Sequence, residues 1–174
     1  IAPVFQRDKD EPLLLSYAQQ RQWFLWKMDP HSCAYTIPLA IRLRGSLDVP
    51  ALQRSFDALV ARHESLRTVF VEAEDGRVSP KIQPPSALSL TVQALPDASP
   101  EALGRVVDAQ MAQPFDLATG PLVRATLLQV AEDDYVLVVT QHHIVSDAWS
   151  MGVMVDEVLS AYGAFSCGQV PQPK

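Results

Sequence analysis

The chain has 174 residues, of which 48% are hydrophobic and 20% are charged, a balance typical of a globular protein with one core. Its net charge of -6, with no cluster of Lys and Arg, excludes the basic surface that binding to nucleic acid requires. No apolar run approaches the roughly 20 residues of a membrane span, and no signal peptide is visible. The two cysteines are too distant for a metal or disulfide motif, so we expect a cytoplasmic domain or lobe.

Helix caps, turn residues and apolar periodicity predict the secondary structure. Ser16, Asp48 and Ser99 are suited to cap helices, and Pro30 and Pro114 to end them. In chain order we expect a helix at 16–28, a strand at 36–43, a helix at 48–62, strands at 66–71, 77–82 and 88–94, a helix at 99–113, strands at 121–130 and 135–143, and a helix at 147–165.

Two features of this pattern predict how the strands are arranged. Asp75-Gly76 is a strong hairpin signal between the strands at 66–71 and 77–82. Residues 136–139 are all apolar without alternation, which indicates a strand covered on both faces and therefore central in its sheet. Helices that alternate with mostly paired strands imply a layered αβ sandwich.

Polar and titratable residues gather at 141–150, where the last strand gives way to the last helix. Neighbouring side chains of a strand point to opposite faces, so only one of His142 and His143 can be catalytic. Asp147 lies at the start of the helix, where its carboxylate can cap the helix or hold a nearby cation. In the plainer alternative both histidines are hydrogen-bonded core groups and Asp147 is only a cap; the complete cluster favours a function.

Two other chemistries fit this segment less well. A zinc site needs three or four ligands, and only His143 and Asp147 converge, so no metal is expected. A serine nucleophile requires a strained turn such as GxSxG, whereas Ser146 and Ser150 suit the start of a helix.

Four segments resemble the motifs of one known family, in that family's order. HHIVSDAWS at 142–150 resembles the HHxxxDG signature of condensation domains of non-ribosomal peptide synthetases and of their chloramphenicol-acetyltransferase-like relatives. SYAQQRQWFL at 16–25, RHESLRTVF at 62–70 and PFDLATGPLVR at 114–124 are similar to three further motifs. Together the four segments span nearly the whole chain, which makes the resemblance specific.

The resemblance implies an α/β fold of the chloramphenicol-acetyltransferase-like αβ-sandwich type. Residues 13–166 would form a single lobe, the N-terminal one, with a mixed β-sheet flanked by helices. Residues 1–12 would be a lead-in. The Pro-rich stretch at 167–174 would be a linker toward a C-terminal lobe missing from this chain, which begins with Ile1 and looks like part of a longer protein.

The resemblance also assigns roles within the site. His143 would be the catalytic histidine, with His142 packed behind it. Asp147 would be mainly structural, with Arg62 as its ion-pair partner. Equally, Arg62 would be a surface cation favoured by the dipole at a helix C-terminus.

The segment after Asp147 carries the candidate channel-lining residues Ala148, Trp149 and Ser150. Ala148 departs from the family, which has Gly at this position. Glycine tolerates backbone conformations and close approaches that alanine does not, so the methyl group would narrow the channel or reduce activity. If the backbone here is helical, the methyl group is harmless.

The implied activity is acyl transfer that forms an amide or peptide bond. A donor acyl or peptidyl thioester would be joined to an acceptor aminoacyl thioester, each delivered on the phosphopantetheine arm of a carrier protein, with no cofactor bound by the domain itself. The partners would be the C-terminal lobe, the upstream and downstream carrier proteins and an adjacent adenylation domain. The isolated lobe is expected to be inactive, because the substrate tunnels need both lobes.

Three alternatives remain open. An epimerisation domain shares the HHxxxDG element, although AWSMGV after Asp147 looks more like the condensation pattern. A stand-alone acyl-CoA-dependent acyltransferase has the same fold. A non-catalytic carrier-docking lobe is the third, with Ala148 as its only hint. A likeness of SYAQQRQWFLW to siderophore synthetases is a weaker lead.

Overall fold

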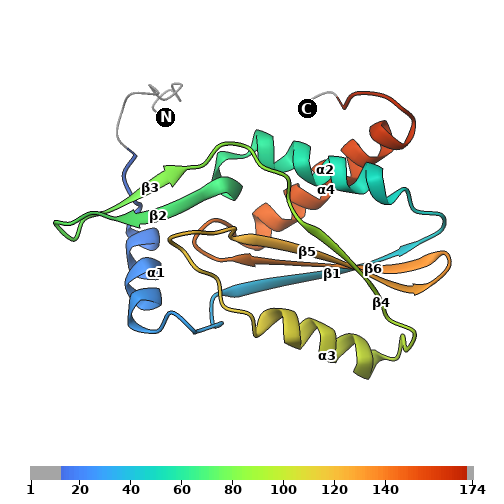
Figure 1. The fold of residues 1–174 in the computed structure, drawn as a ribbon, viewed down its shortest axis with the longest axis horizontal. Helices are drawn as coiled ribbons and strands as arrows, with labels where there is room; N and C mark the ends of the chain where they lie inside the picture. The colour runs from blue at the N-terminus through green and yellow to red at the C-terminus, as the bar shows by residue number, and fades with distance from the viewer. Residues whose placement is uncertain (1–12, 172–174) are drawn as a thin grey trace.

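The computed structural model describes residues 13–171 (Figure 1). In chain order its elements are α1 (Tyr17–Met28), β1 (Thr36–Arg44), α2 (Val49–Arg62), the short 3-10 helix η1 (Glu64–Arg67), β2 (Thr68–Glu72), β3 (Val78–Ile82), β4 (Leu90–Ala94), α3 (Pro100–Met111), β5 (Val123–Ala131), β6 (Asp134–His142) and α4 (Ala148–Ser166).

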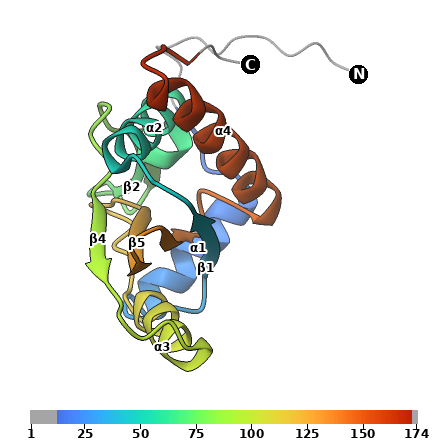
Figure 2. The same ribbon diagram turned by 90° about the vertical axis from the view of Figure 1, so that its right-hand side faces the viewer.

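Helices enclose a central four-stranded sheet with the order β1-β6-β5-β4. β6 pairs antiparallel with both β1 and β5, whereas β4 runs parallel to β5, so the sheet is mixed. α2 and α4 pack together on one face and α3 lies on the other (Figure 2). The expected αβ sandwich with a mixed sheet flanked by helices is confirmed.

The central place of β6 is also confirmed, and its two faces explain the unbroken apolar run. Leu137 and Val139 belong to the core formed with α2 and α4, while Val136 and Val138 face α3 on the opposite side. Because both faces of β6 are covered, an alternation of apolar and polar residues would have placed polar side chains in one of the two cores. β6 stays buried up to its last residue, His142, and the exposed His143 follows directly.

Local signals placed the helices well. Asp48 Oδ1 accepts a hydrogen bond from the Ala51 N–H at 2.9 Å, and α2 begins at the next residue. Ser16 and Gln19 form a reciprocal capping box at the start of α1. Such caps satisfy N–H groups that the first helical turn leaves without partners, so they fix where a helix begins.

Strand ends were predicted less well. The expected strand at 66–71 is preceded by η1, so β2 starts only at Thr68, and its hairpin with β3 forms a separate two-stranded sheet. That hairpin turns at Gly76, whose φ of 78° is unfavourable for other residues. β6 ends at His142 rather than at residue 143, because the chain turns there and the His143 N–H bonds to Tyr35 O at 2.8 Å.

α1 packs at one end of the lobe, against the hairpin and the segment after β6. Trp23 of α1 is buried in a cluster with Phe70, Phe115, Leu117 and Ile144, which come from three later parts of the chain. This cluster holds α1 against the segment that contains the two histidines. No helix within residues 13–171 is both long and apolar enough to cross a membrane.

Candidate active site

His142 is the buried member of the histidine pair. Its ring is 4% exposed and lies near the rings of Tyr35 and Phe115, with centroid distances of 6.3 and 6.2 Å. Nδ1 accepts a hydrogen bond from the Ile144 N–H at 3.0 Å, which places the proton of the neutral ring on Nε2. Burial, and then the neighbouring charge of His143, lowers the pKa of His142 to about 4. The ring is therefore neutral at pH 7 and braces the turn.

His143 is the exposed member, and it lines a pocket of about 350 Å³. One wall of this pocket, which we call the His143 pocket, is formed by residues 143–147 and by Ser150. The opposite wall is α1 with its cap, contributed by Ser16, Gln19 and Gln22. One histidine is buried and the other is exposed, as expected for neighbouring positions at the end of a strand. The turn that follows His142 moves the two side chains further apart.

Asp147 caps α4. Its backbone is extended, and Oδ1 accepts a hydrogen bond from the Ser150 N–H at 2.8 Å. Hydrogen bonds from Ser150 lower the pKa of Asp147, and the charge of His143 lowers it further. The capping role expected from its position is thus present, and the carboxylate also lies within the electrostatic reach of His143.

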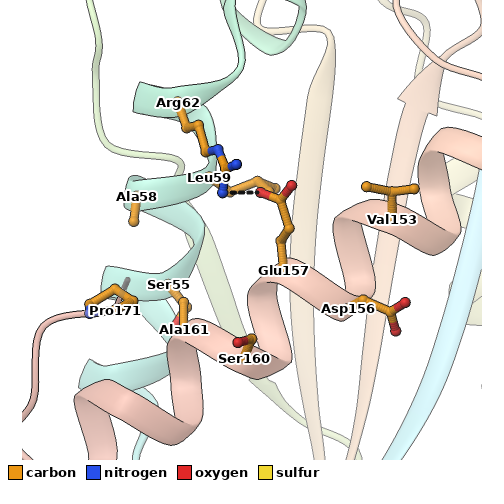
Figure 3. Close-up of a pocket in the computed structure, with 10 residues that line it drawn as sticks. All are labelled: Ser55, Ala58, Leu59, Arg62, Val153, Asp156, Glu157, Ser160, Ala161 and Pro171. Atoms are coloured by element: carbon orange, nitrogen blue, oxygen red, sulfur yellow. Dashed lines mark ion pairs between the residues drawn. The ribbon is translucent and has the colours of Figure 1, made fainter. Parts of the chain in front are cut away.

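Arg62 is placed differently from the expectation. Among the described residues it pairs with Glu157 of α4, Nη1 to Oε2 3.5 Å, and not with Asp147 (Figure 3). His63 Nε2 lies 2.8 Å from the same Glu157 oxygen. Glu157 is ten positions beyond Asp147, about 15 Å along the axis of α4. The end of α2 packs beside the middle of α4, which brings Arg62 to Glu157 rather than to Asp147. The expected Arg62–Asp147 ion pair is therefore wrong, and Arg62 and His63 connect the two helices through Glu157.

The three candidate channel residues occupy the first turn of α4. Ala148 is the first helical residue, and no non-glycine residue in the described part of the chain has a positive φ. The departure from glycine therefore strains nothing in the backbone, in line with the harmless alternative. Ser150 lines the His143 pocket, Trp149 is 83% exposed and lines a second pocket, and Ala148 lines neither of the two.

α1 contributes polar groups that sequence reasoning did not assign to the site. Gln19 Nε2 donates to Ile144 O at 3.5 Å and so ties the helix to the histidine turn. Gln22 lines the His143 pocket, and its buried Oε1 has no hydrogen-bond partner within residues 13–171. The motif at 16–25 was recognised, but nothing in its own residues showed that it faces position 143.

No three His, Cys, Asp or Glu side chains within residues 13–171 are arranged to hold a metal ion. Cys33 and Cys167 are both free thiols. What the site offers is one exposed imidazole, a backbone held by a neutral buried imidazole, and amide side chains across a pocket. Such groups can bind, orient and exchange a proton with a polar substrate.

A family model for the condensation domain matches residues 9–174, so the chain belongs to the condensation-domain family. It is 42% identical over 173 residues to one protein of the linear gramicidin synthase of Brevibacillus parabrevis, covering 98% of this chain and 2% of that protein. It is 46% identical over 171 residues to the malpinin synthetase of Mortierella alpina, covering 97% and 2%.

Solved structures agree with this assignment. The starter condensation domain of the rhizomide synthetase RzmA superposes with a TM-score of 0.85 at 26% identity, over 95% of this chain and 40% of that one. A complex of the X-domain and OxyB from teicoplanin biosynthesis gives a TM-score of 0.85 at 32% identity, over 98% and 36%. The chain thus spans well under half of these solved chains and a few per cent of the synthetases.

Proposed function

We propose that this chain is the N-terminal lobe of a peptide-bond-forming condensation domain and that His143 is its catalytic residue. The observation that carries the proposal is the exposure of the His143 imidazole in a pocket between α1 and the start of α4. A buried neighbour, His142, fixes the turn through its bond to the Ile144 N–H. The family supplies the reaction class, and the pocket supplies a place for it.

The proposed reaction is attack by the amine of an acceptor aminoacyl thioester on the carbonyl carbon of a donor thioester. The C–N bond forms, the C–S bond of the donor breaks, and the proton lost by the amine ends on the leaving thiol. An α-amino group with a pKa near 8 is roughly one-tenth neutral at pH 7, so no strong base is needed. His143 accepts or shares the amine proton and hydrogen-bonds the tetrahedral intermediate.

The other wall of the reaction chamber comes from the C-terminal lobe in this proposal. Upstream and downstream carrier proteins present both substrates on phosphopantetheine arms, an adenylation domain charges them, and the assembly works in the cytoplasm. The lobe itself holds no cofactor. Most of the acceleration then comes from holding two tethered substrates together, which converts an encounter into a reaction within one complex.

Replacing His143 tests the proposal. We expect His143→Ala in the complete condensation domain to reduce amide formation between two loaded carrier proteins by about 10²- to 10⁴-fold, the usual contribution of a proton-transferring side chain. Single-turnover product formation is followed by mass spectrometry of the carriers. His31→Ala is the matched control, because His31 is an exposed histidine in another part of the lobe. Full turnover by His143→Ala with an unchanged melting temperature would contradict a catalytic role.

One comparison favours a second candidate function. The teicoplanin X-domain is seen in a complex with OxyB, another protein, and it is 32% identical to this chain. A lobe whose role is to bind a partner protein fits that likeness. This candidate would be supported over condensation if the complete parent protein binds a loaded carrier without turnover. His143→Ala would then leave the binding unchanged.

A further inference from the structure

A second pocket adjoins the His143 pocket. It measures about 230 Å³ and lies between the end of α2, the end of β6 and the first turns of α4. The two pockets share Val145, Ser146 and Ser150, so they lie on either side of the turn that carries the catalytic histidine. We call the second one the Gln141 pocket, after the only residue of β6 that lines it.

Gln141 has a polar group with no good partner within the described part of the chain. Its side chain is 1% exposed, yet Oε1 accepts no hydrogen bond and Nε2 contacts only the Met154 Sδ, at 2.8 Å. A thioether is a weak acceptor. Exchanging the amide oxygen and nitrogen would face the oxygen with a thioether that has no hydrogen to donate and would leave the N–H groups without an acceptor, so the orientation given is the better one. Buried polar groups normally have partners, so this amide points to one that arrives from outside the lobe.

The position of Gln141 aims its side chain at this pocket. The backbone is paired on both sides, with Ile37 of β1 and Val123 of β5, so the alternation of the strand is fixed. Gln141 therefore points to the same face as Val139, toward α2 and α4. The last torsion of a glutamine is broad, which lets the amide turn toward a ligand without moving the strand.

The other lining residues set the size and polarity of an occupant. Pockets for whole small ligands usually measure about 300–1,000 Å³, so 230 Å³ suits one side chain better than a complete substrate. Leu59, Leu66, Val153 and Met154 make most of the wall apolar, whereas His63, Ser65 and Ser146 add polar groups and Trp149 is exposed. The occupant is therefore mainly apolar and carries at least one hydrogen-bond donor, which faces Gln141 Oε1.

We propose that the Gln141 pocket receives the side chain of one of the two carrier-bound residues, and that Gln141 accepts a hydrogen bond from an O–H or N–H group on that side chain. The proposal rests on the proposed function, because only a substrate held at His143 brings a side chain to the adjoining pocket. Either the donor residue or the acceptor residue can present such a side chain, so the test examines both positions. Gln141 then acts as a specificity-determining residue and takes no part in proton transfer.

The test uses the complete synthetase with Gln141→Leu, which keeps the approximate volume and removes hydrogen bonding. Aminoacyl-phosphopantetheine is loaded directly onto the carriers, which bypasses selection by adenylation. Tyrosine is compared with phenylalanine and threonine with valine, first as donor with a fixed acceptor and then as acceptor with a fixed donor. At one of the two positions we expect the natural domain to prefer a hydroxyl-bearing residue by about tenfold in kcat/KM, and the variant to lose that preference.

Two further variants keep the result interpretable. Gln129→Leu makes the same chemical change at an exposed position of β5 and should leave the preference unchanged. Val153→Phe narrows the Gln141 pocket from a residue that is 43% exposed and should selectively slow the larger side chains, which tests the pocket even if Gln141→Leu does not fold.

The two proposals fail in different ways. An equal preference in natural and Gln141→Leu domains at both positions, or a Val153→Phe domain that slows every substrate equally, would overturn the role of the Gln141 pocket while condensation stands. Undiminished turnover by His143→Ala would instead overturn the proposed function.

Discussion

His142 makes a structural contribution that depends on pH. Burial lowers its pKa to about 4, whereas an unfolded chain has a histidine near 6.5. As the pH falls from 6.5 to 4, the unfolded state takes up a proton that the folded state does not, so the folded domain loses stability over this window. The full shift corresponds to about 3 kcal/mol at most.

This effect can be isolated with His142→Asn, in which the amide oxygen replaces Nδ1 as acceptor for the Ile144 N–H. We expect urea unfolding of the natural domain to show a steeper loss of stability between pH 6.5 and 4 than unfolding of the variant. Carboxylates titrate in both proteins and cancel in the difference. Identical slopes would show that His142 is not held neutral in the folded state.

The histidine pair also shows which features of the site can be predicted from the sequence. The divergence of His142 and His143 follows from backbone geometry, so it was predictable from adjacent positions. The partner of Arg62 was not, because an ion pair between helices depends on their relative placement along both axes. Gln22 was missed for the same reason: its distance from position 143 in the sequence leaves no local signal.

The N-terminus of α4 shapes the wall of the His143 pocket that lies opposite α1. Asp147 accepts the Ser150 N–H bond that begins this helix, and both residues line the His143 pocket. Asparagine is as good a helix cap as aspartate, whereas alanine is a poor one. Asp147→Asn and Asp147→Ala therefore separate the cap from the charge.

We expect Asp147→Asn to keep most of the turnover of the complete domain and Asp147→Ala to lose several-fold, because the first turn of α4 frays and the pocket wall with it. Turnover is compared with helix content from circular dichroism. If both variants lose activity to the same extent, the carboxylate charge beside His143 is what matters, and capping is secondary.

Caps and apolar runs explain why the helices and the central strand were predicted with nearly correct bounds. Both signals are local: Asp48 caps its own helix, and residues 136–139 record that two layers cover them. The element that local signals did not predict is η1, where an expected strand begins as a 3-10 turn. The β2–β3 hairpin follows from its local turn, but its separation from the main sheet and the place of Phe70 in one cluster with Trp23 of α1 are long-range features that no short segment reports.

His143 lines a pocket to which this chain contributes α1 and the start of α4, and the chain covers only 40% of a solved condensation-domain chain. The proposed advantage of the enzyme lies in holding two substrates together, for which one wall is insufficient. We therefore expect the 174-residue chain alone to form no amide product above the uncatalysed rate from two loaded carriers. The complete domain serves as the positive control under the same conditions. Product formation by the chain alone at a comparable rate would refute the need for a second lobe.

The contact between Gln19 and Ile144 joins positions 125 residues apart. During translation at about 5–20 residues per second, one side of the pocket leaves the ribosome roughly 6–25 seconds before the other. Until Phe115, Leu117 and finally Ile144 have been made, α1 lacks these partners for Trp23, so the nascent lobe leaves this side chain open to chaperones. The His143 pocket is therefore complete only when the lobe is nearly finished, because no shorter nascent chain contains both of its walls.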